Sequence, residues 1–238
     1  MNNPRGGLNR RLTDYSQEVT GSSRPPLPIL PVAAMGSGAA LIMAVFTGTT
    51  LALTLPLFGA FAGLVFFLKY SRAGATDRLA IKAQVKMGLA AGIVATLAYD
   101  SLRLALVRIV GFNFAPLGAL PLFGHLLIGK GASVEAAWLA GAAYHYLNGI
   151  AFSIAYCLAL GGRNWKWGVL WALGLEGAMF AVYPGWLHLS GILEEFTIVS
   201  LSGHVAYGTV LGQVSQRYLN KVRDMGLLKA FRVRPDRP

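Results

Sequence analysis

The stretch PVAAMGSGAALIMAVFTGTTLALTLPLFGAFAGLVFFL (residues 31–68) contains no charged side chain. About 20 consecutive apolar residues suffice for one helix to cross the hydrocarbon core of a bilayer. The stretch is therefore too long for one spanning helix and just long enough for two. Its turn-forming letters TGTT (residues 47–50) predict the break between them.

Four further apolar blocks follow along the chain, at residues 87–107, 134–160, 167–187 and 193–214. Across the 238 residues, 55% are hydrophobic and only 13% are charged, whereas a soluble domain carries about 25% charged residues. We therefore predict an all-α fold: a polytopic membrane bundle of about six transmembrane helices.

The basic residues indicate how this bundle is oriented. A net charge of +11 in a soluble protein would suggest a nucleic-acid partner, but here the basic residues cluster in short segments between apolar blocks. If the N-terminus is cytoplasmic, 18 of the 21 Lys and Arg residues lie inside, and Arg103, Arg108 and Lys130 lie outside. Such a bias follows the positive-inside rule. It predicts an inner-membrane protein with both termini cytoplasmic and no nucleic-acid partner.

The predicted bundle covers residues 31–215, and three segments of the chain do not belong to its spans. Residues 1–30 are expected to form a flexible basic cytoplasmic arm. Residues 112–132 are apolar but interrupted by Pro116 and Pro121, which predicts an irregular outer-face or partly re-entrant segment. Residues 216–238 form a basic cytoplasmic tail, for which a helix on the inner leaflet and a disordered tail are both open.

Small residues recur at a spacing of four. The pairs are Gly59 and Gly63, Gly88 and Gly92, Gly149 and Ser153, and Gly208 and Gly212. Residues four apart share one helix face, where small side chains allow neighbouring backbones to approach closely. The pattern predicts tight helix packing and carries no information about function.

Ionisable and polar residues inside the predicted spans form what we call the polar layer: Asp100, Arg103, His145, Asn148, Glu176 and His204. His145, Glu176 and His204 each lie 11 residues from the outer end of a span, which places them roughly 16 Å deep at about 1.5 Å per residue. Asp100 is expected at about 12 Å, with Arg103 one turn shallower. Ionisable residues at such depth are candidates for a functional site.

The two histidines sit in matching His-x-x-x-Gly motifs, His145 with Gly149 and His204 with Gly208. In a helix the glycine lies one turn away on the same face, so it forms a notch beside the imidazole. Another helix, a lipid or quinone ring, or a flat cofactor would fit such a notch.

Several interpretations of the polar layer remain open. It is either structural, since buried polar side chains also bond helices together, or functional. As a functional site, it would coordinate or relay ions and protons, bind zinc or iron through Glu176, His145, His204 and Asp100, or ligate a haem through the two histidines.

The leading hypothesis is a non-enzymatic membrane protein. It would act as a small-solute or ion permease, or as a subunit of a larger membrane complex. Its partners would be the lipid bilayer and other membrane subunits, or further copies of itself. The alternative is a haem- or metal-binding redox protein that uses His145 and His204.

Overall fold

The computed structural model describes residues 29–187 and 189–224, and every regular element in those two ranges is helical. The elements are α2 (Ile29–Ala34), α3 (Gly36–Thr47), α4 (Leu51–Arg72), α5 (Ala75–Val110), α6 (Leu120–Ile128), α7 (Val134–Leu160), α8 (Lys166–Phe180), α9 (Tyr183–Trp186), the 3-10 turn η1 (Ser190–Ile192) and α10 (Leu193–Asp224). The prediction of an all-α bundle is confirmed. Most of the predicted N-terminal arm and C-terminal tail lies outside the described residues.

The first apolar stretch folds as a helical pair that turns at the predicted place. α3 ends at Thr47, Gly48 adopts a φ of 68°, and α4 begins at Leu51. A positive φ favours glycine because it has no Cβ. The Thr54 hydroxyl then joins the pair by donating to the Ala40 carbonyl at 2.9 Å. The predicted break is thus confirmed, although the first helix is itself divided at Met35 into α2 and α3.

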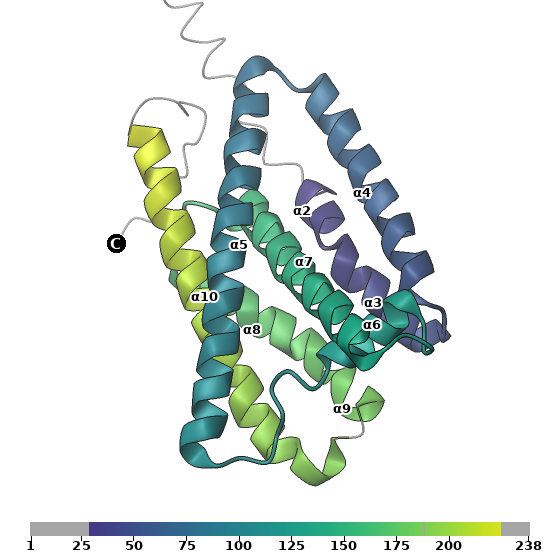
Figure 1. The fold of residues 1–238 in the computed structure, drawn as a ribbon. Helices are drawn as coiled ribbons and strands as arrows, with labels where there is room; N and C mark the ends of the chain where they lie inside the picture. The colour runs from purple at the N-terminus through teal and green to yellow at the C-terminus, as the bar shows by residue number, and fades with distance from the viewer. Residues whose placement is uncertain (1–28, 188, 225–238) are drawn as a thin grey trace, which may run out of the picture.

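The remaining helices assemble around α5, which packs against both α7 and α10, while α8 packs against α10 (Figure 1). Three of the four predicted small-residue pairs lie at these contacts: Gly88–Gly92, Gly149–Ser153 and Gly208–Gly212. A side chain at Gly88 would collide with the Ile154 backbone, and one at Gly208 with the Gly168 backbone. The small residues therefore allow the close approach that the spacing predicted.

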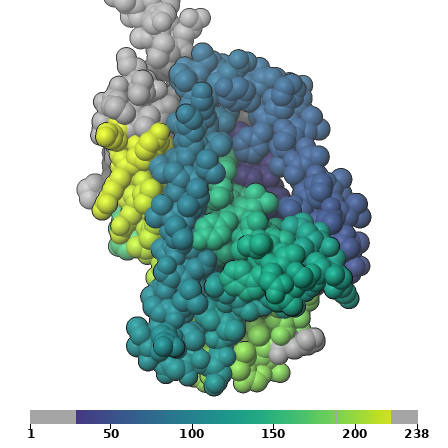
Figure 2. All heavy atoms as spheres, viewed as in Figure 1, coloured from purple at the N-terminus to yellow at the C-terminus, as the bar shows by residue number. Residues whose placement is uncertain are grey.

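The fourth pair, Gly59 and Gly63 of α4, faces open space, because a Cβ atom at either position would have no neighbouring atom within 4 Å. In the view of Figure 2, part of α4 stands apart from α5, and the first helical segment (residues 29–47) is visible in the hollow between them. α4 is also the only helix in the described part of the chain that is both long and apolar enough to cross a membrane. The six predicted spans therefore remain a prediction.

The long helices alternate in direction, so the basic segments gather at one end of the bundle. The turn from α4 to α5 lies at the same end as the C-terminal part of α10 (Figure 1). The loop between α7 and α8 joins them there, because the Trp165 backbone N–H donates to Gln216 of α10 at 2.9 Å. Arg163 lies in this loop, and Lys166 is the first residue of α8.

Two predicted boundaries differ from the structure. The helix expected at residues 167–187 ends at Phe180, and the short α9 follows it. Pro184 explains the break, because its ring clashes with the carbonyl four residues earlier and it has no N–H to donate. α10 runs without interruption to Asp224, so the first part of the predicted basic tail continues the preceding helix.

The predicted irregular segment at residues 112–132 is partly helical. Its second half forms α6, which packs so closely on α7 that a side chain at Gly124 would meet the Ala137 backbone. Its first half is held by Glu195, whose carboxylate accepts a hydrogen bond from the Phe114 backbone N–H at 2.8 Å. This segment forms part of the wall around the polar layer.

Candidate functional site

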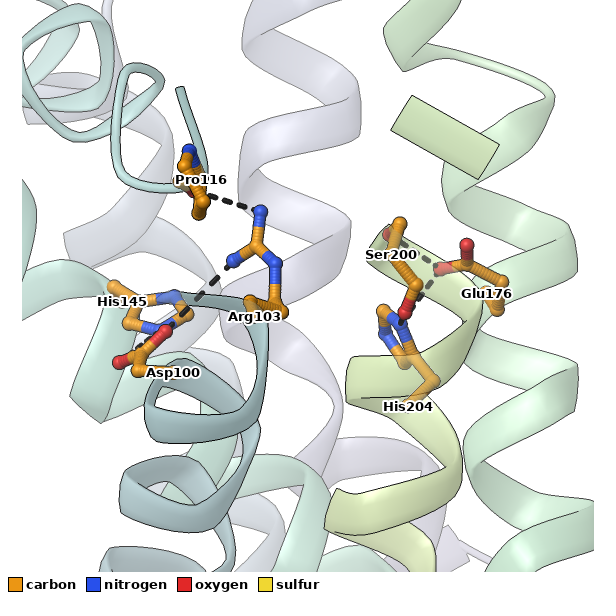
Figure 3. Close-up of polar contacts among 7 residues, drawn as sticks. All are labelled: Asp100, Arg103, Pro116, His145, Glu176, Ser200 and His204. Atoms are coloured by element: carbon orange, nitrogen blue, oxygen red, sulfur yellow. Dashed lines mark hydrogen bonds and ion pairs between the residues drawn. The ribbon is translucent and has the colours of Figure 1, made fainter. Parts of the chain in front are cut away.

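Two histidine–carboxylate pairs form the core of the polar layer, and each joins two helices. His145 of α7 places Nε2 3.2 Å from both carboxylate oxygens of Asp100 on α5. His204 of α10 places Nδ1 2.7 Å from Oε2 of Glu176 on α8 (Figure 3). His145, Glu176 and His204 therefore do not meet at a single point. The structure instead gives each histidine its own acid.

The Glu176–His204 pair is the more deeply buried one, with the Glu176 residue only 3% exposed. The Ser200 hydroxyl donates to Glu176 Oε2 at 3.1 Å, and His204 Nδ1 lies 3.0 Å from the Ser200 carbonyl. Because that carbonyl oxygen only accepts hydrogen bonds, the geometry favours a proton on Nδ1. Oε1 of Glu176 has no partner among the described residues, so both contacts of this side chain are made by Oε2.

Arg103 lies one turn beyond Asp100 on α5 and is 7% exposed. Its Nη1 is 3.7 Å from Asp100, and its Nη2 donates to the Pro116 carbonyl at 2.7 Å. Its Nε has no partner in the described part of the chain. The side chain therefore holds a buried positive charge with unused donor capacity.

Tyr99, which the sequence prediction does not include, connects the two pairs. Its ring centroid lies 5.9 Å from that of His145 and 4.9 Å from that of His204, and the Arg103 guanidinium covers the ring at 4.5 Å. A signal is present in the sequence, because Tyr99 and Arg103 are four residues apart and so share one face of a helix.

The two glycine notches are filled by neighbouring helices. Thr96 of α5 occupies the space beside Gly149, and the backbone of α8 occupies the space beside Gly208. The open Gly149 carbonyl accepts a hydrogen bond from the Tyr207 hydroxyl at 2.6 Å. Each notch is therefore filled by another helix, as one of the sequence-based alternatives expected. That helix leaves no space for a lipid, quinone or cofactor ring.

The geometry also disfavours the proposed metal and haem sites. Within residues 29–187 and 189–224, no three His, Cys, Asp or Glu side chains converge on a point that would hold a metal ion. A haem ligated by His145 and His204 would need a flat space between them, but the Tyr99 ring contacts both imidazoles. The ligand set expected for zinc, iron or haem is thus not brought together.

Asn148 links the layer to the first helical pair. Its side-chain carbonyl accepts a hydrogen bond from the Ser37 hydroxyl at 2.7 Å, so α7 is joined to α3 by polar as well as apolar contacts. The nearby Tyr144 hydroxyl donates to the Ser37 carbonyl at 2.9 Å. Both bonds hold α7, the helix that carries His145, against α3.

The polar layer borders a cavity of about 470 Å³, here called the central cavity. Four members of the layer line it: Arg103, His145, Asn148 and His204. Asp100 and Glu176 do not line it, although each contacts a histidine that does. The rest of the wall is mostly apolar, and the volume falls in the range of about 300–1,000 Å³ that is usual for small-molecule sites.

No protein family, curated protein or solved structure matches this chain.

Proposed function

We propose that this chain is a multi-pass integral membrane protein of six spans that binds a small solute in the central cavity and passes it across the membrane. The six spans would be formed by α2 with α3, then α4, α5, α7, α8 and α10, which alternate in direction (Figure 1). The polar layer would then lie within the bilayer, on four of these helices.

Exposed apolar surface supports the membrane environment. α4 alone exposes Leu53, Leu57, Phe61, Leu64 and Phe67. Soluble monomers rarely expose contiguous apolar patches of more than a few hundred Å², and a lipid environment removes the cost of this surface. The basic end of the bundle would face the cytoplasm, following the positive-inside rule.

The observation that carries the permease proposal is that the central cavity reaches two buried histidine–carboxylate pairs at once. Ionisable groups are costly within a membrane, and they commonly mark the path of a solute or ion. A purely structural role would not require a cavity beside both pairs. A haem or metal redox role has less support, because the required ligands do not converge among the residues that the structure describes.

Reconstitution tests this proposal. Liposomes containing the protein would be loaded with a mixed pool of low-molecular-weight solutes, and the efflux of each would be followed by mass spectrometry. We expect protein-dependent efflux that falls in Glu176→Gln and in His204→Ala and is unchanged in Glu194→Gln, which alters an exposed acid outside the layer. Efflux that is equal in all four proteins would contradict the proposal.

A role as a subunit of a larger membrane complex is the second candidate, and the exposed face of α4 favours it. Gly59 and Gly63 lie on that face without a neighbour in the described part of the chain, whereas such pairs usually pack against another membrane helix. Mild detergent extraction followed by cross-linking from Gly63→Cys tests this role. Capture of another membrane protein by Gly63→Cys that a second substitution, Gly59→Leu, abolishes in the same chain would support it.

A further inference from the structure

We infer that the central cavity accepts a single-chain amphiphile with an anionic head group, which enters from the bilayer and places that head group beside Arg103. This inference rests on the proposed membrane location and names the class of solute. A long-chain carboxylate is the simplest molecule of this class.

The apolar part of the wall suits a hydrocarbon chain. Apolar side chains from residues 112–132 and from α7, α8 and α10 line the cavity: Leu117, Leu120, Phe123, Phe152, Met179 and Phe196. A volume of about 470 Å³ is that of a site for one small ligand, so one acyl chain fits better than a two-chain lipid. Because the chain leaves a bilayer that is equally apolar, its burial adds little affinity, and the head group has to supply most of the preference for the cavity.

The mouth of the cavity is apolar too. Ile42 of α3 and Leu122 of α6 line the cavity, yet they are 41% and 45% exposed. Ala178 of α8 also lines it and is exposed, as do Ala115 and Gly118 of the segment before α6. The exposed part of the lining is therefore apolar, which suits the entry of an amphiphile from the bilayer.

The charges on the wall select the sign of the head group. Three basic side chains line the cavity (Arg103, His145 and His204), and no acidic one does among the described residues. Asp100 and Glu176 do not line the cavity and are already engaged by the histidines. A cationic head group would therefore find no acidic side chain on the wall, whereas an anionic head group would find basic side chains that can donate hydrogen bonds to it.

Arg103 is the strongest anchor because it is permanently charged. Its contact with Asp100 is an ion pair at 3.7 Å, longer than a hydrogen bond, and its Nη2 bonds only to a neutral carbonyl. Its Nε lacks a partner among the described residues. A carboxylate accepts parallel N–H bonds from a guanidinium and forms one of the stronger hydrogen-bonded pairs, so it would use the donors that the protein leaves free.

Photo-crosslinking in membranes tests the inference. The probe is a fatty acid with a diazirine in its chain, compared with an alcohol and a trimethylammonium amphiphile of the same length and diazirine position. We expect the acid to label peptides of α3, α6 and α8, with at least about 10-fold less labelling by the other two, since a charge-assisted hydrogen bond is about twice as strong as a neutral one. A lysophosphatidate and a plain fatty acid, used as competitors, show whether phosphate or carboxylate is preferred, and either preference supports an anionic head group.

Variants locate the head group. Arg103→Gln is expected to reduce labelling by the acid about 10-fold and to leave labelling by the alcohol unchanged, which also shows that the variant is folded. Arg103→Lys is expected to restore part of the loss. Arg108→Gln is the matched control, because this arginine lies on the same helix, is exposed and does not line the cavity.

Equal labelling by the acid, the alcohol and the cation would overturn the inference, as would an absence of label from all peptides that line the cavity. Either result leaves the permease proposal standing if efflux still depends on Glu176. Conversely, labelling by the acid that depends on Arg103, together with no efflux of any loaded solute, would support the binding site and contradict transport of water-soluble solutes.

Discussion

At the scale of single residues, the carboxyl group of Glu176 is the most deeply buried acidic group among the side chains that the structure describes. It is 3% exposed, and its contacts come from His204 and Ser200 on α10. Removing one partner of a buried hydrogen-bonded pair leaves a polar group unsatisfied, which typically costs about 1–3 kcal/mol and more for a charged group. The stability of the α8–α10 contact should therefore depend on which partner is replaced.

We predict that His204→Ala lowers the free energy of unfolding by about 2–3 kcal/mol, whereas Glu176→Gln has a smaller effect. The side-chain oxygen of the glutamine still accepts hydrogen bonds from Ser200 and His204. The double variant should recover part of the loss caused by His204→Ala, because the unpaired acid is gone. Thermal unfolding of the detergent-solubilised variants measures all three effects, and an additive double variant would argue against a coupled pair.

At the scale of helices, glycine positions with the same sequence spacing have different surroundings. Gly208 of α10 touches the α8 backbone, while Gly63 of α4 faces open space. We predict that Gly208→Ala destabilises the protein by about 1–3 kcal/mol through overpacking, and that Gly63→Ala is neutral or stabilises it by up to about 1 kcal/mol through helix propensity. Unfolding temperatures of the two variants provide the comparison. A loss at Gly63 as large as that at Gly208 would indicate that another helix covers the α4 face.

The long helices and the break at residues 47–50 are predictable because they depend on local composition, whereas the breaks at Met35 and after Phe180 are not predicted. The turn at residues 47–50 and the candidate polar residues come from runs of apolar letters and their interruptions. The pairing of these residues is not predictable, because depth along a helix fixes the level of a side chain and not the direction in which it points. The sequence places Asp100 about one turn from His145 in depth, yet the two are in contact.

Tyr99 shows a second limit of sequence-based prediction. An aromatic residue in an apolar helix usually packs in the core, so nothing in its own identity marks it as the group between two histidines. Its role follows only from the packing of α5 between α7 and α10. Likewise, the filling of the Gly149 notch by Thr96 depends on the rotation of α5, which sequence periodicity does not determine.

At the scale of the whole molecule, the distribution of charge predicts which loops lie on which side of the membrane. The turn from α4 to α5 and the loop from α7 to α8 have basic residues in or beside them, namely Lys69, Arg72, Arg163 and Lys166. The loop before α7 lies at the opposite end and carries Lys130 alone between α6 and α7. The positive-inside rule assigns the first two to the cytoplasm.

Cysteine labelling tests this assignment with little background, because the only cysteine, Cys157, is buried. We predict that Gly131→Cys, before α7, reacts with a membrane-impermeant maleimide in intact cells. Ser71→Cys, beside the α4–α5 turn, should react only after the cells are permeabilised. Both positions are exposed, so a difference between them reports the membrane and not burial. Labelling of both from the same side would be incompatible with the alternating six-span arrangement, and labelling of Ser71→Cys alone from outside would invert it.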